Sequence, residues 1–221
     1  AAWLVSFSLQ DEPVEDGDEA EPSSWELLGD GLALLRANRA FRGLTLLAIF
    51  TLPLGDYLLT LYQPRFVAVG APPIWLGLGM ACGSLVGLVL TANAWRLQVW
   101  LGPRWALLLA AGLPGLLYLL FAAATGPTPS VFLFVLLVGS IGLKTPLFSE
   151  HLNRHIASRN RATLLSLISM GTSLYDALMG LVIGGVADSF GLTPTFVLMG
   201  AVVLAATLIF GAGQPRSEAL T

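Results

Sequence analysis

Three ionisable side chains stand inside long apolar stretches of this chain: Asp56, Lys144 and Asp176. A charge at the centre of a lipid bilayer costs about 2.5–3.5 kcal/mol on insertion scales, so each of the three needs a compensating reason. A carboxylate in poorly hydrated surroundings holds a proton more readily than one in water, which makes Asp56 and Asp176 candidates for carrying a proton. The structural alternative for each residue is pairing across helices and, for Lys144, a side chain that reaches the membrane interface.

The depths of these residues follow from their positions if the apolar stretches are helical. At a rise of about 1.5 Å per residue, Asp56 and Asp176 lie about 20 Å from the inner edges of their stretches, and Lys144 lies about 9 Å from its own. The two acids are then nearly level, and the lysine is too near the inner side to pair with either acid unless the helices tilt. Three tyrosines nearby could supply hydroxyl groups to a solute, although a place at the lipid interface is the alternative for each: Tyr57, Tyr62 and Tyr175.

Other chemistry-bearing residues form weaker patterns. His151 and His155 are four residues apart beside Glu150, a spacing that can present two imidazoles to one metal ion. A third ligand is missing from the sequence motif, so histidines at the membrane interface beside Arg154 are the favoured interpretation. The sequence shows no glycine-rich phosphate loop and no nucleophile–base pair, so we expect no metal, no cofactor and no enzyme activity. Cys82 is the only cysteine, which excludes a disulfide within the chain, and its apolar surroundings predict a small buried side chain.

Six apolar stretches are long enough to position these residues within a membrane. A bilayer core about 30 Å thick needs roughly 20 apolar helical residues to cross it. The apolar residues do not alternate with polar ones as they do in barrel strands, so the stretches predict helices. The predicted spans are 43–62, 74–95, 105–125, 130–150, 163–187 and 193–211. The fold class is therefore an all-α membrane protein, with a six-helix transmembrane bundle over residues 43–212.

The composition supports this fold class. Charged residues make up 11% of the 221 residues, against about 25% in soluble domains. Nine of the 14 acidic residues fall between Asp11 and Asp30, so the formal net charge of −3 describes one acidic segment. No basic patch suits nucleic acid, whereas the lipid bilayer is an expected partner.

The distribution of Lys and Arg predicts the orientation, because cytoplasmic loops of membrane proteins carry an excess of basic residues. Alternate ends of the spans collect nine basic residues on one side and one, Arg65, on the other, with Lys144 inside a span. We therefore expect a multi-pass protein of the inner cell membrane with both termini in the cytoplasm. Aromatic residues at span ends can anchor the helices at the interface, and those expected to do so are Trp75, Trp95, Trp105 and Tyr62.

The segments outside the bundle have separate predicted roles. Residues 1–9 are apolar and look like the end of a preceding transmembrane helix. Residues 10–42 contain an acidic cytoplasmic linker, QDEPVEDGDEAEP, and then an amphipathic helix with Ser23 and Glu26 in capping-box spacing. Residues 213–221 form a cytoplasmic tail.

Small residues and prolines recur within the predicted spans. Glycines at four-residue spacing let helices approach closely where lipid gives no hydrophobic drive to associate, and we expect them to pack helices within the chain. They are Gly79, Gly83, Gly87, Gly180 and Gly184. Prolines inside a span can bend or open a helix, and those here are Pro53, Pro114 and Pro146.

The stretch HLNRHIASRNRATLLSLISM over residues 151–170 carries the clearest resemblance to a known family. It resembles the loop before helix eleven, and the start of that helix, in bacterial transporters of the major facilitator superfamily. GGVADSFG and AAWLVSFSLQDEP are similar to the ends of helices eleven and six, and Gly102 with Arg104 matches the Gly-x-Arg remnant of the signature loop. The resemblance implies that the chain is a fragment, the C-terminal half of a twelve-helix transporter whose N-terminal six-helix half precedes it.

In that superfamily helices seven and ten line the solute path, and helix eleven flanks it. The resemblance therefore implies that Asp56 and Lys144 face a central cavity and that Asp176 lies beside it, with Tyr57 as an adjoining candidate on the solute path. It also implies a secondary active transporter that moves a small solute by alternating access, and the acids inside the spans favour coupling to protons. Two alternatives from other classes remain, a six-span scaffold or assembly protein and a membrane-embedded lipid-modifying enzyme.

Overall fold

The computed structural model describes Gly29, residues 39–155 and residues 161–211. The helix end predicted over 1–9, the linker and amphipathic helix predicted over 10–42 and the tail predicted over 213–221 lie outside the described residues, apart from Gly29 and residues 39–42. Over the described ranges every regular element is a helix, and six spans are long and apolar enough to cross a membrane. The predicted fold class, an all-α membrane protein with six transmembrane helices, is confirmed.

The first span is built from two helices, α3 (Arg39–Thr51) and α4 (Leu54–Ala68). Backbone polar groups in a bilayer must be paired within their own segment, which is why long apolar runs form helices there. The second span, α5 (Ile74–Ala92), is followed by the short α6 (Ala94–Leu101). The remaining spans are α7 (Pro103–Ala123), α8 (Pro127–His155), α9 (Arg161–Phe190) and α10 (Leu192–Gly211).

Several boundaries differ from the sequence prediction. The first span starts at α3, four residues earlier than predicted. Its α4 continues through Pro64 to Ala68, because Arg65 is bound inside the protein and does not end the span. Residues 96–101, predicted as part of a loop, belong to α6, which stops at Gly102 with a φ of 78°. A positive φ suits glycine, and the proline that follows is favoured at the first position of α7.

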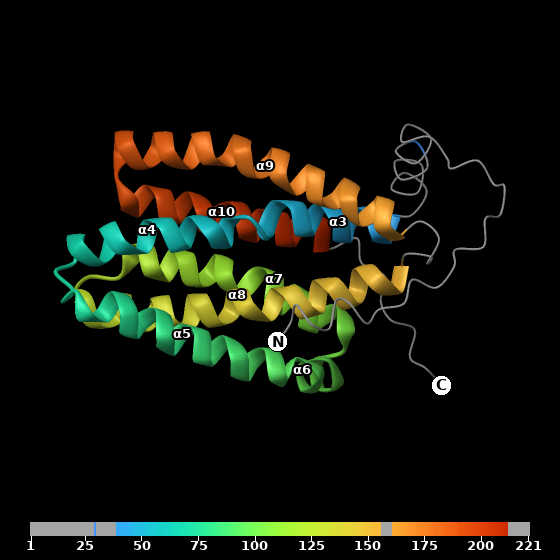
Figure 1. Cartoon of the computed structure of the whole chain (residues 1–221), viewed down its shortest axis with the longest axis horizontal. Helices are drawn as coiled ribbons and strands as arrows, with labels where there is room; N and C mark the ends of the chain where they lie inside the picture. The colour runs from blue at the N-terminus through green and yellow to red at the C-terminus, as the bar shows by residue number, and fades with distance from the viewer. Residues whose placement is uncertain (1–28, 30–38, 156–160, 212–221) are drawn as a thin grey trace, which may run out of the picture.

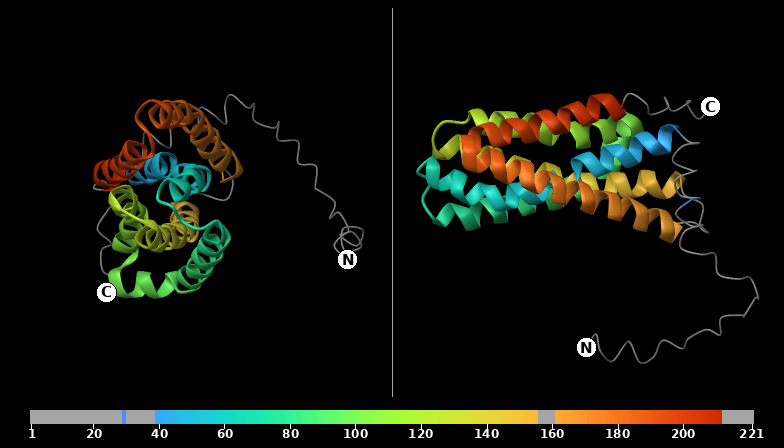
Figure 2. Two further views of the ribbon diagram at one scale, coloured as in Figure 1. Left: turned by 90° about the vertical axis from the view of Figure 1, so that its left-hand side faces the viewer. Right: turned by 90° about the horizontal axis from the view of Figure 1, so that it is seen from above.

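Figures 1 and 2 show how the helices are arranged. α9 lies at one edge of the bundle and α5 at the opposite edge; between them α10 lies beside α3, and α7 lies beside α8. Of the most apolar stretch in each span, 11% is buried in α9 and 17% in α5, against 50% in α3–α4 and 53% in α8. In the end-on view α4 and α8 lie on one side of the bundle, between the two edge helices, and α7 and α10 lie on the other.

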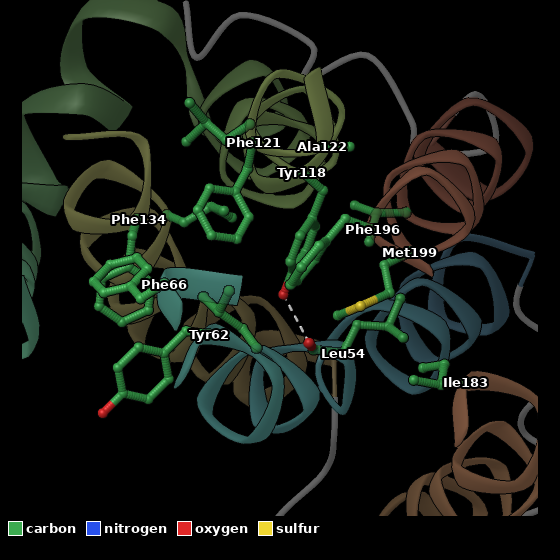
Figure 3. Close-up of a cluster of buried hydrophobic side chains, with 14 of the residues drawn as sticks. Leu54, Tyr62, Phe66, Tyr118, Phe121, Ala122, Phe134, Ile183, Phe196 and Met199 are labelled. Carbon is green, nitrogen blue, oxygen red and sulfur yellow. Dashed lines mark hydrogen bonds between the residues drawn. The ribbon is translucent and has the colours of Figure 1, made fainter. Parts of the chain in front are cut away.

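Two clusters of buried side chains fill the interior. The first surrounds α3 and includes Phe41, Leu44, Leu47, Leu107 and Leu143. The second surrounds α4 and is rich in aromatic rings, shown in Figure 3: Tyr62, Phe66, Tyr118, Phe121, Phe134 and Phe196. Tyr62 stacks on Phe134 with ring centroids 4.5 Å apart and is 9% exposed. The interface position predicted for Tyr62 is therefore wrong, because its ring completes this cluster.

The exposed residues at the helix ends include the three tryptophans expected there, with Trp75 41%, Trp95 60% and Trp105 63% exposed. Cys82 is also exposed, on α5, so the prediction of a buried side chain is wrong. The reason is that α5 buries mainly its glycine face, and Cys82 lies off that face.

The glycine face of α5 lies directly against α8. A Cβ atom on Gly83 would come within 2.7 Å of the Val138 side chain, and one on Gly79 would come within 3.3 Å of Phe134. The two backbones nearly touch at Gly87, whose Cα lies 3.4 Å from where a Cβ on Gly142 would be. On α9, a Cβ on Gly180 would lie 3.1 Å from the Tyr57 hydroxyl, whereas Gly184 has nothing within 4 Å.

Candidate functional site

The first span is broken at Leu52 and Pro53. Proline has no N–H for the carbonyl four residues back and its ring crowds that carbonyl, so a helix kinks or breaks there. By contrast, Pro114 and Pro146 stay inside the continuous helices α7 and α8. Across the break Gly55 N donates to Leu52 O at 3.2 Å. Thr51 O therefore lacks the donor that it would have in a continuous helix.

Lys144 supplies that missing donor. Its Nζ donates a hydrogen bond of 3.0 Å to the Thr51 carbonyl oxygen, and its side chain is 1% exposed. On the other side of the break, the Tyr118 hydroxyl donates a bond of 2.7 Å to the Leu54 carbonyl oxygen, drawn in Figure 3. Lys144 thus joins α8 to the end of α3, which is the structural alternative considered from the sequence. Its place on a solute path stays a prediction, and its burial lends that prediction no support.

Asp56 lies in the first turn of α4, just after the break, and is exposed. The start of a helix carries free N–H groups and a partial positive charge, which stabilise a nearby carboxylate. Asp56 borders a cavity of about 280 Å³ between α4, α5 and α8, whose lining includes Leu59, Met80, Ser84 and Ile141. The break therefore creates a helix start inside the membrane and places an acid on it, beside a cavity.

Asp176 is brought to the level of Asp56 by Tyr57. The Tyr57 hydroxyl donates a hydrogen bond to the backbone carbonyl of Asp176, which joins α4 to α9. The Oδ1 atom of Asp176 is buried without a hydrogen-bond partner among the described residues, and the same holds for the hydroxyl of Tyr175. Tyr57 thus links α4 to α9 at Asp176, whereas Asp56, the residue before it, borders the cavity beside α5 and α8.

A row of exposed polar side chains runs along α4. Asp56, Thr60 and Gln63 are separated by four and three residues, so they share one face of the helix, and all three are exposed. On α9 three exposed serines follow the same spacing: Ser166, Ser169 and Ser173. On α7 and α10, at the other side of the bundle, large exposed side chains are apolar, among them Leu109, Leu116, Leu120, Leu208 and Ile209. The two sides of the bundle therefore differ in chemistry.

Arg65, predicted as the one basic residue of an outer loop, is instead 8% exposed inside α4. Its guanidinium donates to the Thr193 hydroxyl at 3.1 Å and to the carbonyl oxygens of Phe121, Ala122 and Ala124 at 3.3, 3.1 and 2.8 Å. These carbonyls end α7, where backbone acceptors lack helical donors and carry partial negative charge. Arg65 therefore caps α7 and ties it to the start of α10.

The remaining predicted site residues lie elsewhere. Gly102 and Arg104 form the turn from α6 into α7, and the Arg104 guanidinium carbon lies 5.8 Å from the centre of the Trp105 ring. His151 and His155 lie at the end of α8, and their side chains are outside the described part of the structure. No three His, Cys, Asp or Glu side chains within the described part lie close enough together to hold a metal ion.

Sequence reasoning missed three of these contacts. The free Thr51 carbonyl oxygen could have been inferred, because Pro53 signals a helix break, and a break leaves backbone acceptors without helical donors. Tyr118 and Arg65 gave no such signal, since their partners are backbone carbonyls 64 and 56–59 residues away in the sequence.

Comparisons with known proteins identify no family for this chain. No protein-family model matches the chain, and no curated protein matches it in sequence. The described residues themselves establish an all-α membrane protein with six helical spans, in which Asp56 and Tyr57 directly follow the break of the first span and Tyr57 contacts the backbone of Asp176.

Proposed function

We propose that this chain is one half of a secondary active transporter of the major facilitator type, which moves a small solute by alternating access and is coupled to protons. The observation that carries the proposal is the exposed row of Asp56, Thr60 and Gln63 on α4, beside the cavity of about 280 Å³. A solute path between two halves needs a polar face of this kind. The resemblance of residues 151–170 to the superfamily supports the same function.

The polar row does not suit contact with lipid. An Asp at the bilayer centre costs about 2.5–3.5 kcal/mol, and the Gln63 amide adds polar atoms that lipid cannot pair, whereas the Thr60 hydroxyl donates to the Asp56 carbonyl oxygen at 3.3 Å. Water or a second set of helices would remove this cost. The side of the bundle that carries α4 and α8, between α5 and α9, is therefore the side proposed to meet an N-terminal six-helix half and to line the path.

The proposal gives separate parts to the three ionisable residues. Asp56 is the proton carrier, because it is exposed at the cavity and can exchange a proton there. Asp176 is the second acid at that level, and its Oδ1 has no partner among the described residues. Lys144 keeps the broken first span together. The solute crosses with its covalent bonds unchanged, so the proposal includes no enzyme activity.

The proposed location is the inner cell membrane, with both ends of the chain in the cytoplasm. The described arginines that reach the surface all belong to one end of the bundle, where α3 and α7 begin and α6 lies: Arg39, Arg42, Arg96 and Arg104. At the opposite end the described basic residue is Arg65, which is buried. This asymmetry follows the bias of basic residues toward the cytoplasm.

Access of water to the polar side is the first test. In the full encoded protein with Cys82→Ala, Thr60→Cys and Ser84→Cys test the polar side, and Leu116→Cys and Leu208→Cys are the matched controls on the apolar side. We expect a charged maleimide to label the first pair in native membranes and to leave the second pair unlabelled, because thiols in lipid are not ionised. Equal, slow labelling of both pairs would point to the scaffold alternative instead.

Transport itself is the second test. Vesicles containing the full encoded protein are loaded with labelled sugars, amino acids, organic anions and cationic dyes in turn, with and without an imposed pH gradient. We expect Asp56→Asn to abolish the dependence on the gradient, whereas Asp188→Asn, an exposed acid at the end of α9, retains it. Because surface substitutions of this kind change stability by about 0.5 kcal/mol or less, loss of folding should not explain the result. Unchanged gradient dependence in Asp56→Asn would remove Asp56 from the mechanism.

A further inference from the structure

A second cavity, separate from the proposed path, lies where α5, α6 and α8 meet. Its volume is about 300 Å³, and its lining residues are Leu90, Asn93, Arg96, Leu97, Trp100 and Leu143. None of these residues borders the cavity beside Asp56. The cavity belongs to the end of the bundle that carries the surface arginines.

The cavity has an apolar floor and a polar, aromatic rim. Leu143 is 3% exposed, and Leu90 and Leu97 are partly buried against the first core cluster. Arg96 is exposed and Trp100 is 82% exposed, so these two side chains reach the surface. The spacing of Arg96, Leu97 and Trp100 places them on one face of α6, and that face turns both a cation and an indole toward the opening.

The charge at this rim is not neutralised within the described residues. The Arg96 guanidinium carbon lies 5.4 Å from the centre of the Trp95 ring, and no described carboxylate pairs with it. Trp95 and Trp100 are both exposed on a short helix at the end of a span, which is where indole rings meet the lipid headgroups. An arginine at that level attracts anionic headgroups.

We propose that this cavity binds an anionic glycerophospholipid. Arg96 and Trp100 hold the phosphate region, and the upper part of one acyl chain enters toward Leu90, Leu97 and Leu143. The volume is at the lower end of the roughly 300–1,000 Å³ of small-molecule pockets, so the rest of the lipid lies along the outside of the helices. A free phosphate ion suits the site less well, because the floor offers it only apolar contacts.

Native mass spectrometry of the full encoded protein, titrated with phosphatidylglycerol or phosphatidylcholine of equal chain length, tests the proposal. We expect Arg96→Gln to weaken phosphatidylglycerol binding about fivefold, which corresponds to about 1 kcal/mol per basic residue at the surface, and to leave phosphatidylcholine binding unchanged. Arg96→Lys should retain most of the affinity. Trp100→Ala, at a position that is 82% exposed, should weaken binding without affecting the fold.

Arg42→Gln is the matched control, because Arg42 is an exposed arginine at the same end of the bundle that does not line the cavity. It should change phosphatidylglycerol binding by less than about twofold, because a screened surface charge that does not contact the bound headgroup contributes little. An equal loss in Arg42→Gln and Arg96→Gln would mean unspecific attraction and would overturn the proposal. Displacement of the lipid by millimolar inorganic phosphate would overturn it too, because the site would then be one for the free ion.

Discussion

The two buried basic residues and the two acids within the spans differ in their hydrogen-bond contacts. Lys144 and Arg65 are 1% and 8% exposed, and each donates to backbone carbonyl oxygens at a place where helical bonding is interrupted. Asp56 is exposed beside a cavity, and Asp176 keeps a buried oxygen without a described partner. Both basic side chains thus donate to backbone carbonyl oxygens of this chain, although the Arg65 Nε atom has no described partner, and no described donor reaches the Asp176 Oδ1 atom.

Charged residues that look alike in the sequence therefore have different surroundings in the structure. A buried charge is costly unless its hydrogen-bonding capacity is met. The cations meet part of that requirement at the break between α3 and α4 and at the end of α7, where they join helices of this chain. No donor for the acids is described within this chain, which is why the proposed path is assigned to their side of the bundle.

The largest expected effect is for Arg65→Ala. It removes a buried cation and leaves three carbonyl oxygens at the end of α7 without their donor, so we expect a loss of about 3 kcal/mol in the free energy of unfolding. Denaturation of the purified protein in mixed micelles measures it. Arg39→Ala, at an exposed position near the start of α3, is the control and should change stability by about 0.5 kcal/mol or less. Equal values for the two variants would mean that the guanidinium contacts contribute nothing.

Lys144→Met should cost about 2 kcal/mol, because the Thr51 carbonyl oxygen is left buried and unpaired. A double-mutant cycle with Pro53→Ala sharpens this prediction. An alanine at position 53 permits a continuous helix, in which Gly55 N can reach Thr51 O. Lys144→Met should then cost less in the Pro53→Ala background than in the native one. Additive effects in the cycle would show that the lysine and the break are independent.

Tyr57→Phe should have the smallest effect on stability, about 1 kcal/mol, since it removes one hydrogen bond between α4 and α9. If the acids are functional, the same variant should disturb proton-coupled transport more than it disturbs unfolding, because it releases the backbone beside Asp176. Tyr62→Phe is the control, since its ring belongs to the aromatic cluster and the Asp176 contact is untouched. If Tyr57→Phe transports at the rate of the native protein, Tyr57 has only a structural role.

The six spans and the depths of the two acids could be predicted from the sequence, whereas most side-chain contacts could not. Hydropathy and length found six spans because burial in lipid demands long apolar helices. The level of Asp56 and Asp176 followed from the rise per residue of a helix, and the Tyr57 bond agrees with it. Helix α6 escaped prediction because RLQVWLGPR mixes charge with large apolar residues, a pattern that a loop and an interfacial helix share.

The hydrogen-bond partners of Lys144 and Arg65 could not be predicted from the sequence, for a physical reason. A backbone carbonyl is present at every residue, so a cation that binds carbonyls leaves no complementary side chain to recognise. From the sequence, a lysine in a span was therefore open to two interpretations, a solute path and a structural bond. The location of the helix break explains the structural bond, and a place on the solute path stays a prediction.

The burial of Arg65 also bears on the order in which the protein assembles. Its carbonyl partners are made 56 to 59 residues after it, and Thr193 follows 128 residues after it. At about 5–20 residues per second, the ribosome needs roughly 3–12 s to synthesise the first of these partners. During that interval the guanidinium has no native acceptor, so the end of the first span that carries Arg65 gains its native contacts only after the third span is made.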